Sequence, residues 1–230
     1  MKYGYVFFDL DGTLVNSEEG ITRSVEYALI KLGIAVADRR ELRKFIGPPL
    51  VDSFMRFYDF SEEKAVEACR HYRERYGVKG VYENRVYDGI RELLAELKAM
   101  GAVIVLATSK PEVFAKIVLD DMGLIDYFDF VAGADLDDAD MEGKKNYRTK
   151  KEDVIAHAVD SLGITDKKTV LMVGDRKHDI IGAELNGIDS CGVLFGFGSR
   201  EEFEAAGADI IVERPEEIAA IVRGVHQEPR

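Results

Sequence analysis

From residue 87 onward, helical and strand patterns alternate along the chain, and this alternation constrains the fold more than any other feature. Apolar residues recur at helical spacing in some segments and form short, partly β-branched runs in others. The predicted helices are 90–100, 111–122, 153–162, 180–186 and one led by Pro215; the predicted strands are 103–107, 128–132, 169–173, 191–195 and 210–212. Such alternation predicts an α/β fold, a doubly wound parallel sheet with helices packed on it.

One more strand is predicted near the N-terminus, where the apolar run 5–8 is followed by Asp9, Asp11 and Gly12. The two carboxylates therefore lie at the C-terminal end of a strand. In open parallel sheets this edge is where ligands bind, which favours a functional role. An Asp-Gly pair is also a common turn former, so a purely structural turn is the alternative.

A helical segment separates this first strand from the alternating region. Its apolar residues recur at helical spacing, which predicts about four helices, with Asn16 as a possible first cap and Gly33 as a stop. We expect an α/β core domain of residues 1–15 and 83–230 and a small α-helical domain of residues 16–82 inserted after the first strand.

Composition agrees with a core of this size and excludes some partners. The chain has 230 residues, of which 47% are hydrophobic, and its net charge is −12. A nucleic acid or an anionic membrane surface requires a basic footprint, so neither is expected as a partner. Cys69 and Cys191 form no metal-binding pattern, and no signal peptide or run of about 20 apolar residues is present. We expect a cytoplasmic protein with reduced thiols.

Polar residues follow two other predicted strands. Thr108 and Ser109 come before Pro111, where a hydroxyl and free N–H groups at a helix start can hold a phosphate, although a plain helix cap is the alternative. Asp175 follows the strand 169–173, and Asp179 lies four residues further on. A loop between these two regions carries four lysines, each of which is either a source of positive charge at the site or simply solvated: Lys144, Lys145, Lys150 and Lys151.

The combination of these features favours function over coincidence. Parallel strands carry their C-terminal ends to one edge of the sheet, so Asp9, Asp11, Thr108 and Asp175 should converge there with a lysine nearby. Clustered carboxylates repel one another unless a cation neutralises them. Because the ligands are hard oxygen atoms without a cysteine or histidine set, the sequence predicts Mg²⁺ rather than Zn²⁺.

The motifs resemble those of the haloacid dehalogenase superfamily. They are the DxDGT segment at residues 9–13, Thr108, a lysine at 150 or 151, and Gly174-Asp175 with Asp179, in that order. The helical insert resembles the small cap of the subfamily that contains phosphoglycolate phosphatase. The segments FDLDGTLVNSEEGI, FIGPPL, ATSKPE and VGDRKHDIIGA resemble phosphoglycolate phosphatase-like and 5′-nucleotidase-like members, whereas the loop 135–146 is less typical.

This resemblance implies a Mg²⁺-dependent phosphatase that acts through an aspartyl-phosphate. Asp9 is implied as the nucleophile and Asp11 as the general acid and then the general base. Mg²⁺ is implied to bind Asp9, the backbone carbonyl of Asp11, and Asp175, with Asp179 orienting the cluster. The other implied site residues are Thr108, Ser109, Gly12 and Thr13 at the phosphate, and Lys151, preferred over Lys150, as the screening cation.

Two other classes of activity fit the sequence less well. Dehalogenase chemistry does not need the second aspartate, and nothing in the insert indicates a mutase that must keep water out. A non-catalytic module, either a receiver-like domain or an inactive relative, is the remaining alternative. It is disfavoured because a receiver would not contain the helical insert and because every motif position is filled.

The substrate is expected to be a small phosphorylated metabolite. The resemblance favours phosphoglycolate first and a nucleoside 5′-monophosphate second. Specificity is expected to reside in the turn 45–49 of the insert, with Gly47 in the turn and Lys44 or Arg43 reaching an anionic group of the substrate. A plain connection between helices is the alternative for this turn. The sequence does not indicate the oligomeric state.

Overall fold

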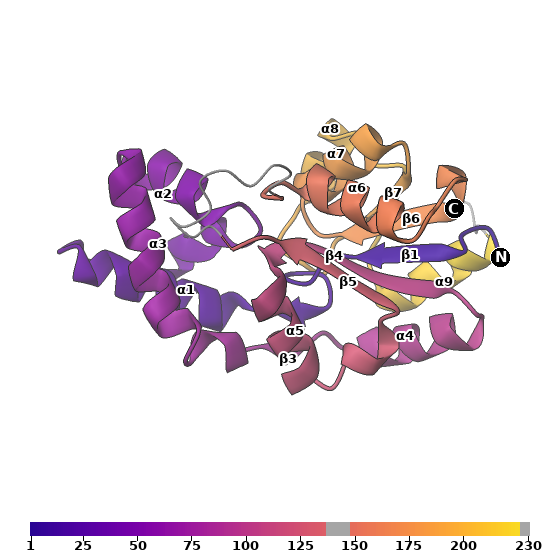
Figure 1. Ribbon diagram of the computed structural model, residues 1–230, viewed down its shortest axis with the longest axis horizontal. Helices are drawn as coiled ribbons and strands as arrows, with labels where there is room; N and C mark the ends of the chain where they lie inside the picture. The colour runs from indigo at the N-terminus through magenta and orange to yellow at the C-terminus, as the bar shows by residue number, and fades with distance from the viewer. Residues whose placement is uncertain (137–147, 226–230) are drawn as a thin grey trace.

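The computed structural model describes residues 1–136 and 148–225. Its centre is a six-stranded sheet in the order β5-β4-β1-β6-β7-β8, in which every neighbouring pair is parallel (Figure 1). The strands are β1 (Tyr5–Phe8), β4 (Val103–Pro111), β5 (Phe130–Ala134), β6 (Val170–Gly174), β7 (Asp189–Val193) and β8 (Ile210–Val212). The doubly wound α/β fold predicted from the alternation is confirmed.

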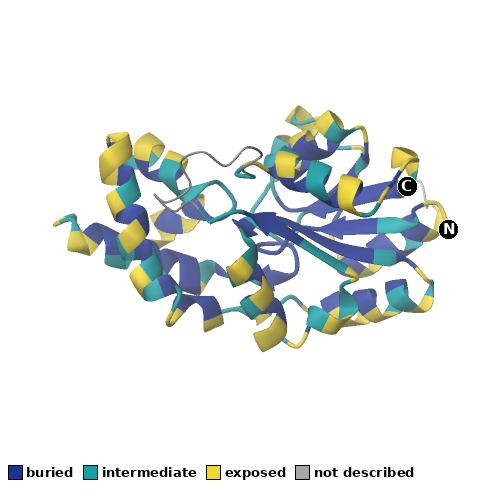
Figure 2. Cartoon of the chain, in the orientation of Figure 1, coloured by how far each residue is buried: buried dark blue, intermediate teal, exposed yellow. Residues whose placement is uncertain are grey.

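Helices cover both faces of this sheet, which is dark blue in Figure 2 because its residues are mostly buried. Phe7 packs with residues of α6 and α7, whereas Val6 and Phe8 lie in the cluster that includes α4, α5 and α9. Apolar side chains therefore leave β1 on both faces, as expected for a central parallel strand. The helices are α4 (Ile90–Ala99), α5 (Glu112–Asp121), α6 (Lys151–Ser161), α7 (Lys177–Asn186), α8 (Arg200–Ala205) and α9 (Pro215–Arg223), with short 3₁₀ helices η3 (Ile125–Tyr127) and η5 (Lys167–Thr169).

The predicted helical segment forms a block beyond the C-terminal edge of the sheet, toward which the strands point in Figure 1. It comprises α1 (Glu18–Lys31), η1 (Arg39–Phe45), α2 (Leu50–Tyr58), α3 (Glu62–Tyr76) and η2 (Gly80–Tyr82). The side chain of Asn16 accepts a hydrogen bond from the Glu18 N–H, and Gly33 adopts a positive φ of 77° just after α1. The N-cap residue of α1 is Ser17, whose side chain makes no capping hydrogen bond, so the predicted cap at Asn16 is wrong by one residue, whereas Gly33 follows the end of the helix as predicted.

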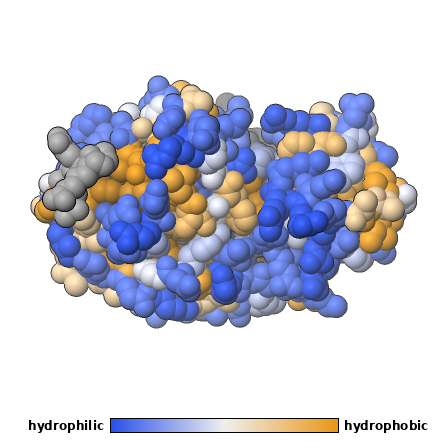
Figure 3. All heavy atoms as spheres, turned by 180° about the vertical axis from the view of Figure 1, so that it is seen from behind, coloured by the Kyte–Doolittle hydropathy of each residue, from blue (hydrophilic) through white to orange (hydrophobic). Residues whose placement is uncertain are grey.

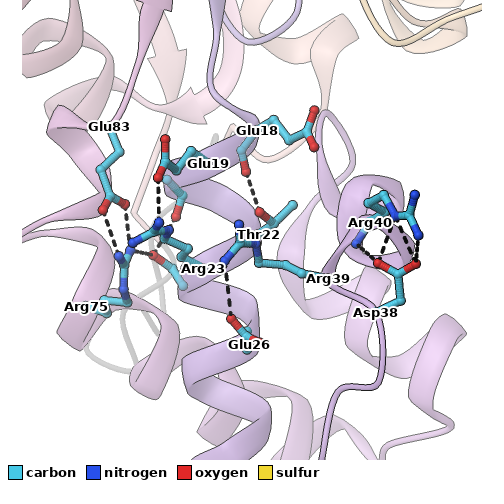
Figure 4. Close-up of polar contacts among 12 residues, drawn as sticks. Glu18, Glu19, Thr22, Arg23, Glu26, Asp38, Arg39, Arg40, Arg75 and Glu83 are labelled. Carbon is cyan, nitrogen blue, oxygen red and sulfur yellow. Dashed lines mark hydrogen bonds and ion pairs between the residues drawn. The ribbon is translucent and has the colours of Figure 1, made fainter.

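Two connecting segments join the block to the sheet, and they pair with each other. Strand β2 (Val15–Asn16) and strand β3 (Arg85–Val86) form a small antiparallel ribbon that the sequence analysis did not predict. Beside it, Arg75 of α3 makes two 2.8 Å hydrogen bonds to the carboxylate of Glu83 (Figure 4). Strands of two residues are too short to leave an alternating pattern. The division into two domains stays a prediction.

The main difference from the prediction concerns β4, which continues to Pro111 instead of ending at Ala107. Its pairing with β5 shifts register between Thr108 and Pro111, so residues 109 and 110 form a bulge. Helix α5 begins at Glu112, and neither Thr108 nor Pro111 caps it through a side chain. The predicted helix start at residue 111 agrees with the structure to within one residue, whereas the predicted strand end at Ala107 and the helix-cap alternative for Thr108 and Ser109 are wrong, because pairing with β5 extends the strand.

The described part of the chain contains no helix that is both long and apolar enough to cross a membrane. Figure 3 shows the face opposite to that of Figure 1, on which hydrophobic areas are interspersed among hydrophilic side chains.

The helix α8 was also not predicted. Its six residues contain few apolar positions, and Phe203 is its buried residue.

Candidate active site

Three aspartates meet at the C-terminal edge of the sheet. Asp9 follows β1 and Asp175 follows β6, and these strands are neighbours with Phe8 paired to Val173. Asp179 lies in the first turn of α7. One carboxylate oxygen from each of the three lies within 4.8 Å of the others, and the residues are 5%, 0% and 1% exposed. The sheet thus brings together side chains that are far apart in sequence.

Lys151 is the buried cation of this cluster. Its Nζ lies 2.7 Å from Asp9 Oδ1 and donates to the Ala107 carbonyl at 2.9 Å. It also lies 2.8 Å from Asp179 Oδ1. Burial lowers the pKa of Lys151, but the neighbouring Asp179 and Asp9 carboxylates outweigh burial and raise it. The structure places Lys151 where the sequence analysis expected it, whereas Lys150 is exposed and Lys144 and Lys145 lie outside the described residues.

The cluster holds more negative charge than one lysine balances. Burial, followed by Asp179 and Asp9, raises the pKa of Asp175 well above its usual range. Burial also raises the pKa of Asp179 to about 6, against the opposing effect of Lys151. Asp175 Oδ2 accepts the Phe197 N–H at 2.9 Å, while its Oδ1 has no hydrogen-bond partner among the described residues. Three carboxylates with a spare oxygen are a donor set that suits a hard divalent cation.

Gly12 allows Asp175 to approach the loop that follows β1. Its φ is +87°, and a Cβ at this position would lie 2.0 Å from Asp175 Oδ2. Any side chain would therefore displace the Asp175 carboxylate. Gly174 has a similar role, because its Cβ would lie 2.1 Å from the Asp179 carboxyl carbon.

We expect Gly12→Ala to lose function for this steric reason and not merely through backbone strain. Gly33→Ala is the matched control, because Gly33 has a φ of +77° and no atom within 4 Å of its Cβ position. Both changes should destabilise the fold by about 1 kcal/mol through the positive φ. Only Gly12→Ala should also abolish catalytic activity, measured alongside thermal unfolding. Equal activity in the two variants would contradict this assignment.

Asp11 has a cationic partner that the sequence analysis missed. Lys110 Nζ lies 2.7 Å and 3.0 Å from the two carboxylate oxygens of Asp11, and Lys110 is only 8% exposed. The same ammonium lies 4.9 Å from the centre of the Tyr76 ring of α3. Lys110 thus links Asp11 to the helical block. Its position directly after Thr108 and Ser109 was the available signal, but its direction depends on the bulge in β4.

The remaining expected phosphate-binding residues lie around the same centre. Thr108 is 1% exposed, and its hydroxyl accepts the Lys110 N–H at 3.2 Å. Thr13 is fully buried, and its hydroxyl has no hydrogen-bond partner among the described residues. Ser109 lines a cavity whose lining also includes Asp11 and Lys110.

This cavity, of about 350 Å³, lies between the helical block and the sheet edge. Asp11 and Lys110 line it from the core, Gly47 and the two prolines of the turn 45–49 line it from the helical block, and Tyr72 and Phe114 contribute aromatic side chains. Two further cations, Arg73 and Lys150, are also on its lining. The cavity is therefore largely apolar, with a few charged groups among its lining residues.

Lys44 and Arg43 do not line this cavity, contrary to our expectation. The Lys44 ammonium lies 4.9 Å from the centre of the Phe57 ring, and Arg43 Nε donates to a Glu18 carboxylate oxygen at 2.7 Å. Both residues belong to the 3₁₀ helix η1, where their side chains contact other residues of the helical block. The predicted contact of Lys44 with the substrate is therefore not supported by the structure.

The fold is that of an established class of enzymes. The chain matches the model of the haloacid dehalogenase-like hydrolases over residues 6–193, and it belongs to that family. The solved structure of a "predicted phosphatase" from Clostridium acetobutylicum superposes with a TM-score of 0.90 at 47% identity, covering 97% of this chain and all of the other.

Named relatives carry more than one activity. A 5′-nucleotidase of Pseudomonas aeruginosa is 47% identical over 89% of both chains. Tyrosine-protein kinase PtkA of Mycobacterium tuberculosis is 36% identical over 90% of this chain and 67% of its own length. A phosphoglycolate phosphatase of Vibrio parahaemolyticus is 28% identical over 94% of this chain and 95% of its own. At the level of the class, the predicted phosphoric monoester hydrolase is confirmed.

Proposed function

We propose that this protein is a Mg²⁺-dependent phosphatase that hydrolyses a phosphate monoester through an aspartyl-phosphate on Asp9. The observation that carries the proposal is the environment of Asp9. Its carboxylate is 5% exposed, lies 2.7 Å from the Lys151 ammonium, and shares a carboxylate cluster with Asp175 and Asp179. The relatives are named for different activities. The proposal therefore rests on the geometry of the site, and the names of the relatives are supporting evidence.

The residues that would hold Mg²⁺ are Asp9 and Asp175, with Asp179 in the same cluster. The spare Oδ1 of Asp175 and the raised pKa values of Asp175 and Asp179 support a cation here, since a bound cation would stabilise both carboxylates in their charged form. When bound, Mg²⁺ supplies charge neutralisation between the Asp9 nucleophile and the phosphoryl oxygens.

In the first step, an oxygen of Asp9 attacks the phosphorus atom and forms an O–P bond, while the ester O–P bond breaks. The departing electron pair stays on the leaving-group oxygen, which takes a proton from protonated Asp11. Lys151 holds the Asp9 carboxylate in place through its 2.7 Å contact and adds positive charge beside the transferring group. The Thr108 and Thr13 hydroxyls and the Ser109 side chain are proposed to bind phosphoryl oxygens.

In the second step, ionised Asp11 takes a proton from a water molecule that attacks the phosphorus. The acyl-phosphate O–P bond then breaks, which releases inorganic phosphate and restores the Asp9 carboxylate. The Lys110 ammonium, at 2.7 Å, holds the Asp11 side chain in a fixed orientation for this step. Lys110 is thus proposed as a positioning residue for the general base.

For the leaving group, the cavity favours a nucleoside over glycolate. About 350 Å³ lined by Tyr72, Phe114 and the two prolines of the turn offers apolar surface that glycolate cannot use. The 47% identical relative named 5′-nucleotidase supports the same choice. A nucleoside 5′-monophosphate is therefore our first candidate substrate and phosphoglycolate, which the sequence analysis ranked first, our second.

The helical block, residues 16–82, is proposed to act as a cap domain over the core formed by residues 1–15 and 83–230. It contributes the turn 45–49 and the residues of α3 that line the cavity, so its closure would exclude water around the substrate. Small phosphorylated metabolites in the cytoplasm are the proposed substrates, and the net charge of −12 supports the absence of a nucleic acid partner.

A panel of phosphate monoesters tests this proposal, with each compound assayed in Mg²⁺ and in EDTA. We expect hydrolysis of p-nitrophenyl phosphate and nucleoside 5′-monophosphates with Mg²⁺ and a loss of at least about 100-fold in EDTA, restored by excess Mg²⁺. Nucleotides should exceed phosphoglycolate in kcat/KM. Turnover that persists without metal would refute the mechanism, and a preference for phosphoglycolate would reverse the order of the two substrates.

A further inference from the structure

Arg176, the residue after Asp175, makes a hydrogen bond from the core to the helical block. Its Nη1 donates to the Ile46 carbonyl at 3.0 Å, and its Nε donates to Glu202 Oε1 at 3.0 Å. Arg176 therefore holds an acceptor of the block with one arm and an acceptor of the core with the other. Neither connecting strand takes part in this contact.

Several hydrogen bonds hold Arg176 on the core side of this contact. Glu202 Oε1 also accepts the Lys177 N–H at 2.8 Å, and the Arg176 N–H donates to Asp179 Oδ2 at 3.0 Å. The guanidinium is therefore anchored at the start of α7, between Asp175 and Asp179 in sequence. Its planar fork allows both arms to donate at once, which a lysine ammonium on a single stem does not reproduce.

The block side of the contact is the turn that lines the cavity. Ile46 is fully buried, and Gly47 adopts a φ of +100° with its Cβ position 3.3 Å from Arg176 Cγ. Because Gly47 has no side chain, the turn sits directly against the arginine stem. Gly47 and the two prolines after it line the cavity. The hydrogen bond to the Ile46 carbonyl therefore forms only when this turn is docked on the sheet edge.

We propose that Arg176 is the latch that holds the helical block closed over the active site. It acts as a positioning residue: its bond to the Ile46 carbonyl forms only when the turn is docked, and it places the wall of the leaving-group cavity relative to Asp175. The inference rests on the proposed function for its catalytic consequence. A charge-assisted hydrogen bond of ordinary strength shifts a closed–open equilibrium by about tenfold or more.

The two cysteines of the chain provide a test that does not depend on activity. Cys69 of α3 lines the cavity and is 3% exposed, so it becomes accessible when the block opens. Cys191 of β7 is fully buried in the sheet, and burial raises the pKa of its thiol to about 12. Alkylation by iodoacetamide, followed by mass spectrometry at each cysteine, therefore separates opening of the block from unfolding of the core.

We expect Arg176→Met to raise the alkylation rate of Cys69 about tenfold and to leave Cys191 unchanged. Arg176→Lys should resemble Arg176→Met. Lysine keeps the positive charge, but it lacks the guanidinium fork that donates to both acceptors at once. Arg200→Met is the control, since Arg200 is an exposed arginine of the same region whose ion pair is with Glu213 at 3.7 Å. Glu202→Gln keeps an acceptor for the Lys177 N–H and should raise the alkylation rate of Cys69 by a smaller factor. This variant replaces Arg176→Met in the test if Arg176→Met does not fold.

Kinetics then separate the latch from damage to the metal loop. With Arg176→Met, KM for a nucleoside 5′-monophosphate should rise several-fold, while the Mg²⁺ concentration for half-maximal hydrolysis of p-nitrophenyl phosphate stays within about twofold. An unchanged Cys69 rate in an active enzyme, or wild-type behaviour of Arg176→Lys, would overturn the latch. Failure of the proposed function itself would appear differently, as an inactive wild-type protein whose Cys69 still responds to the substitution.

Discussion

Asp9→Asn should abolish phosphatase activity, by about 10⁴-fold or more, while the protein stays folded. The substitution removes the nucleophilic oxygen that forms the acyl-phosphate and one carboxylate of the metal cluster, but it preserves the size of the side chain. It also removes one of three mutually repelling charges, which offsets the lost contact with Lys151 at 2.7 Å. Initial rates with saturating Mg²⁺ and thermal unfolding of the same preparations measure the two halves of this prediction.

Asp153→Asn is the matched control for Asp9→Asn. Asp153 lies in the first turn of α6, two residues after Lys151, but its side chain is exposed. It therefore reports the effect of an Asp→Asn change beside the site without changing the carboxylate cluster, and its activity should stay close to wild type. An Asp9→Asn enzyme within tenfold of wild type would exclude Asp9 as the nucleophile.

Asp11→Asn should slow turnover by roughly 10² to 10⁴, the usual range for the loss of a general acid–base group. With an activated leaving group such as p-nitrophenolate, phosphorylation of Asp9 needs little help from an acid. Dephosphorylation still needs a base, so the phosphoenzyme should accumulate. Mass spectrometry of the quenched mutant should then find one added phosphoryl group on Asp9.

Lys110→Met provides the comparison for this second aspartate. It leaves the Asp11 carboxylate in place but removes the ammonium at 2.7 Å, so its defect should be smaller than that of Asp11→Asn. A phosphoryl group found on a serine or histidine of the Asp11→Asn enzyme would refute the assignment of both aspartates.

The parts of this molecule that were predictable from sequence depend on the sheet. Asp9 and Asp175 follow short apolar strands, and parallel strands must carry such residues to one edge. Lys151 could be preferred over Lys150 only through a resemblance. In the structure, Lys151 is the first residue of α6 and is buried, whereas Lys150 precedes the helix and is exposed.

The parts that were missed depend on side-chain direction and on contacts between distant segments. Lys110 faces Asp11 because β4 bulges against β5 after Thr108, and no local pattern specifies that register shift. Lys44 lies on a 3₁₀ helix and packs on Phe57, although its sequence position suggested the substrate. The bond of Arg176 to Ile46 joins residues that are 130 positions apart and uses a backbone carbonyl. Every residue has a backbone carbonyl, so the residue type at position 46 gives no indication of this hydrogen bond.

The place of β1 in the sheet also determines when the molecule can become active during folding. This strand is early in the chain but central in the sheet, and its two neighbours are residues 103–106 of β4 and 170–173 of β6. Contacts of such long sequence separation close slowly, because the entropy of a large loop must be lost before they form. In a nascent chain β1 can therefore pair with β4 first, but its other edge stays unpaired until β6 has been synthesised. Only then do Asp9, Lys151 and Asp175 come together, so a partly made chain has no catalytic centre.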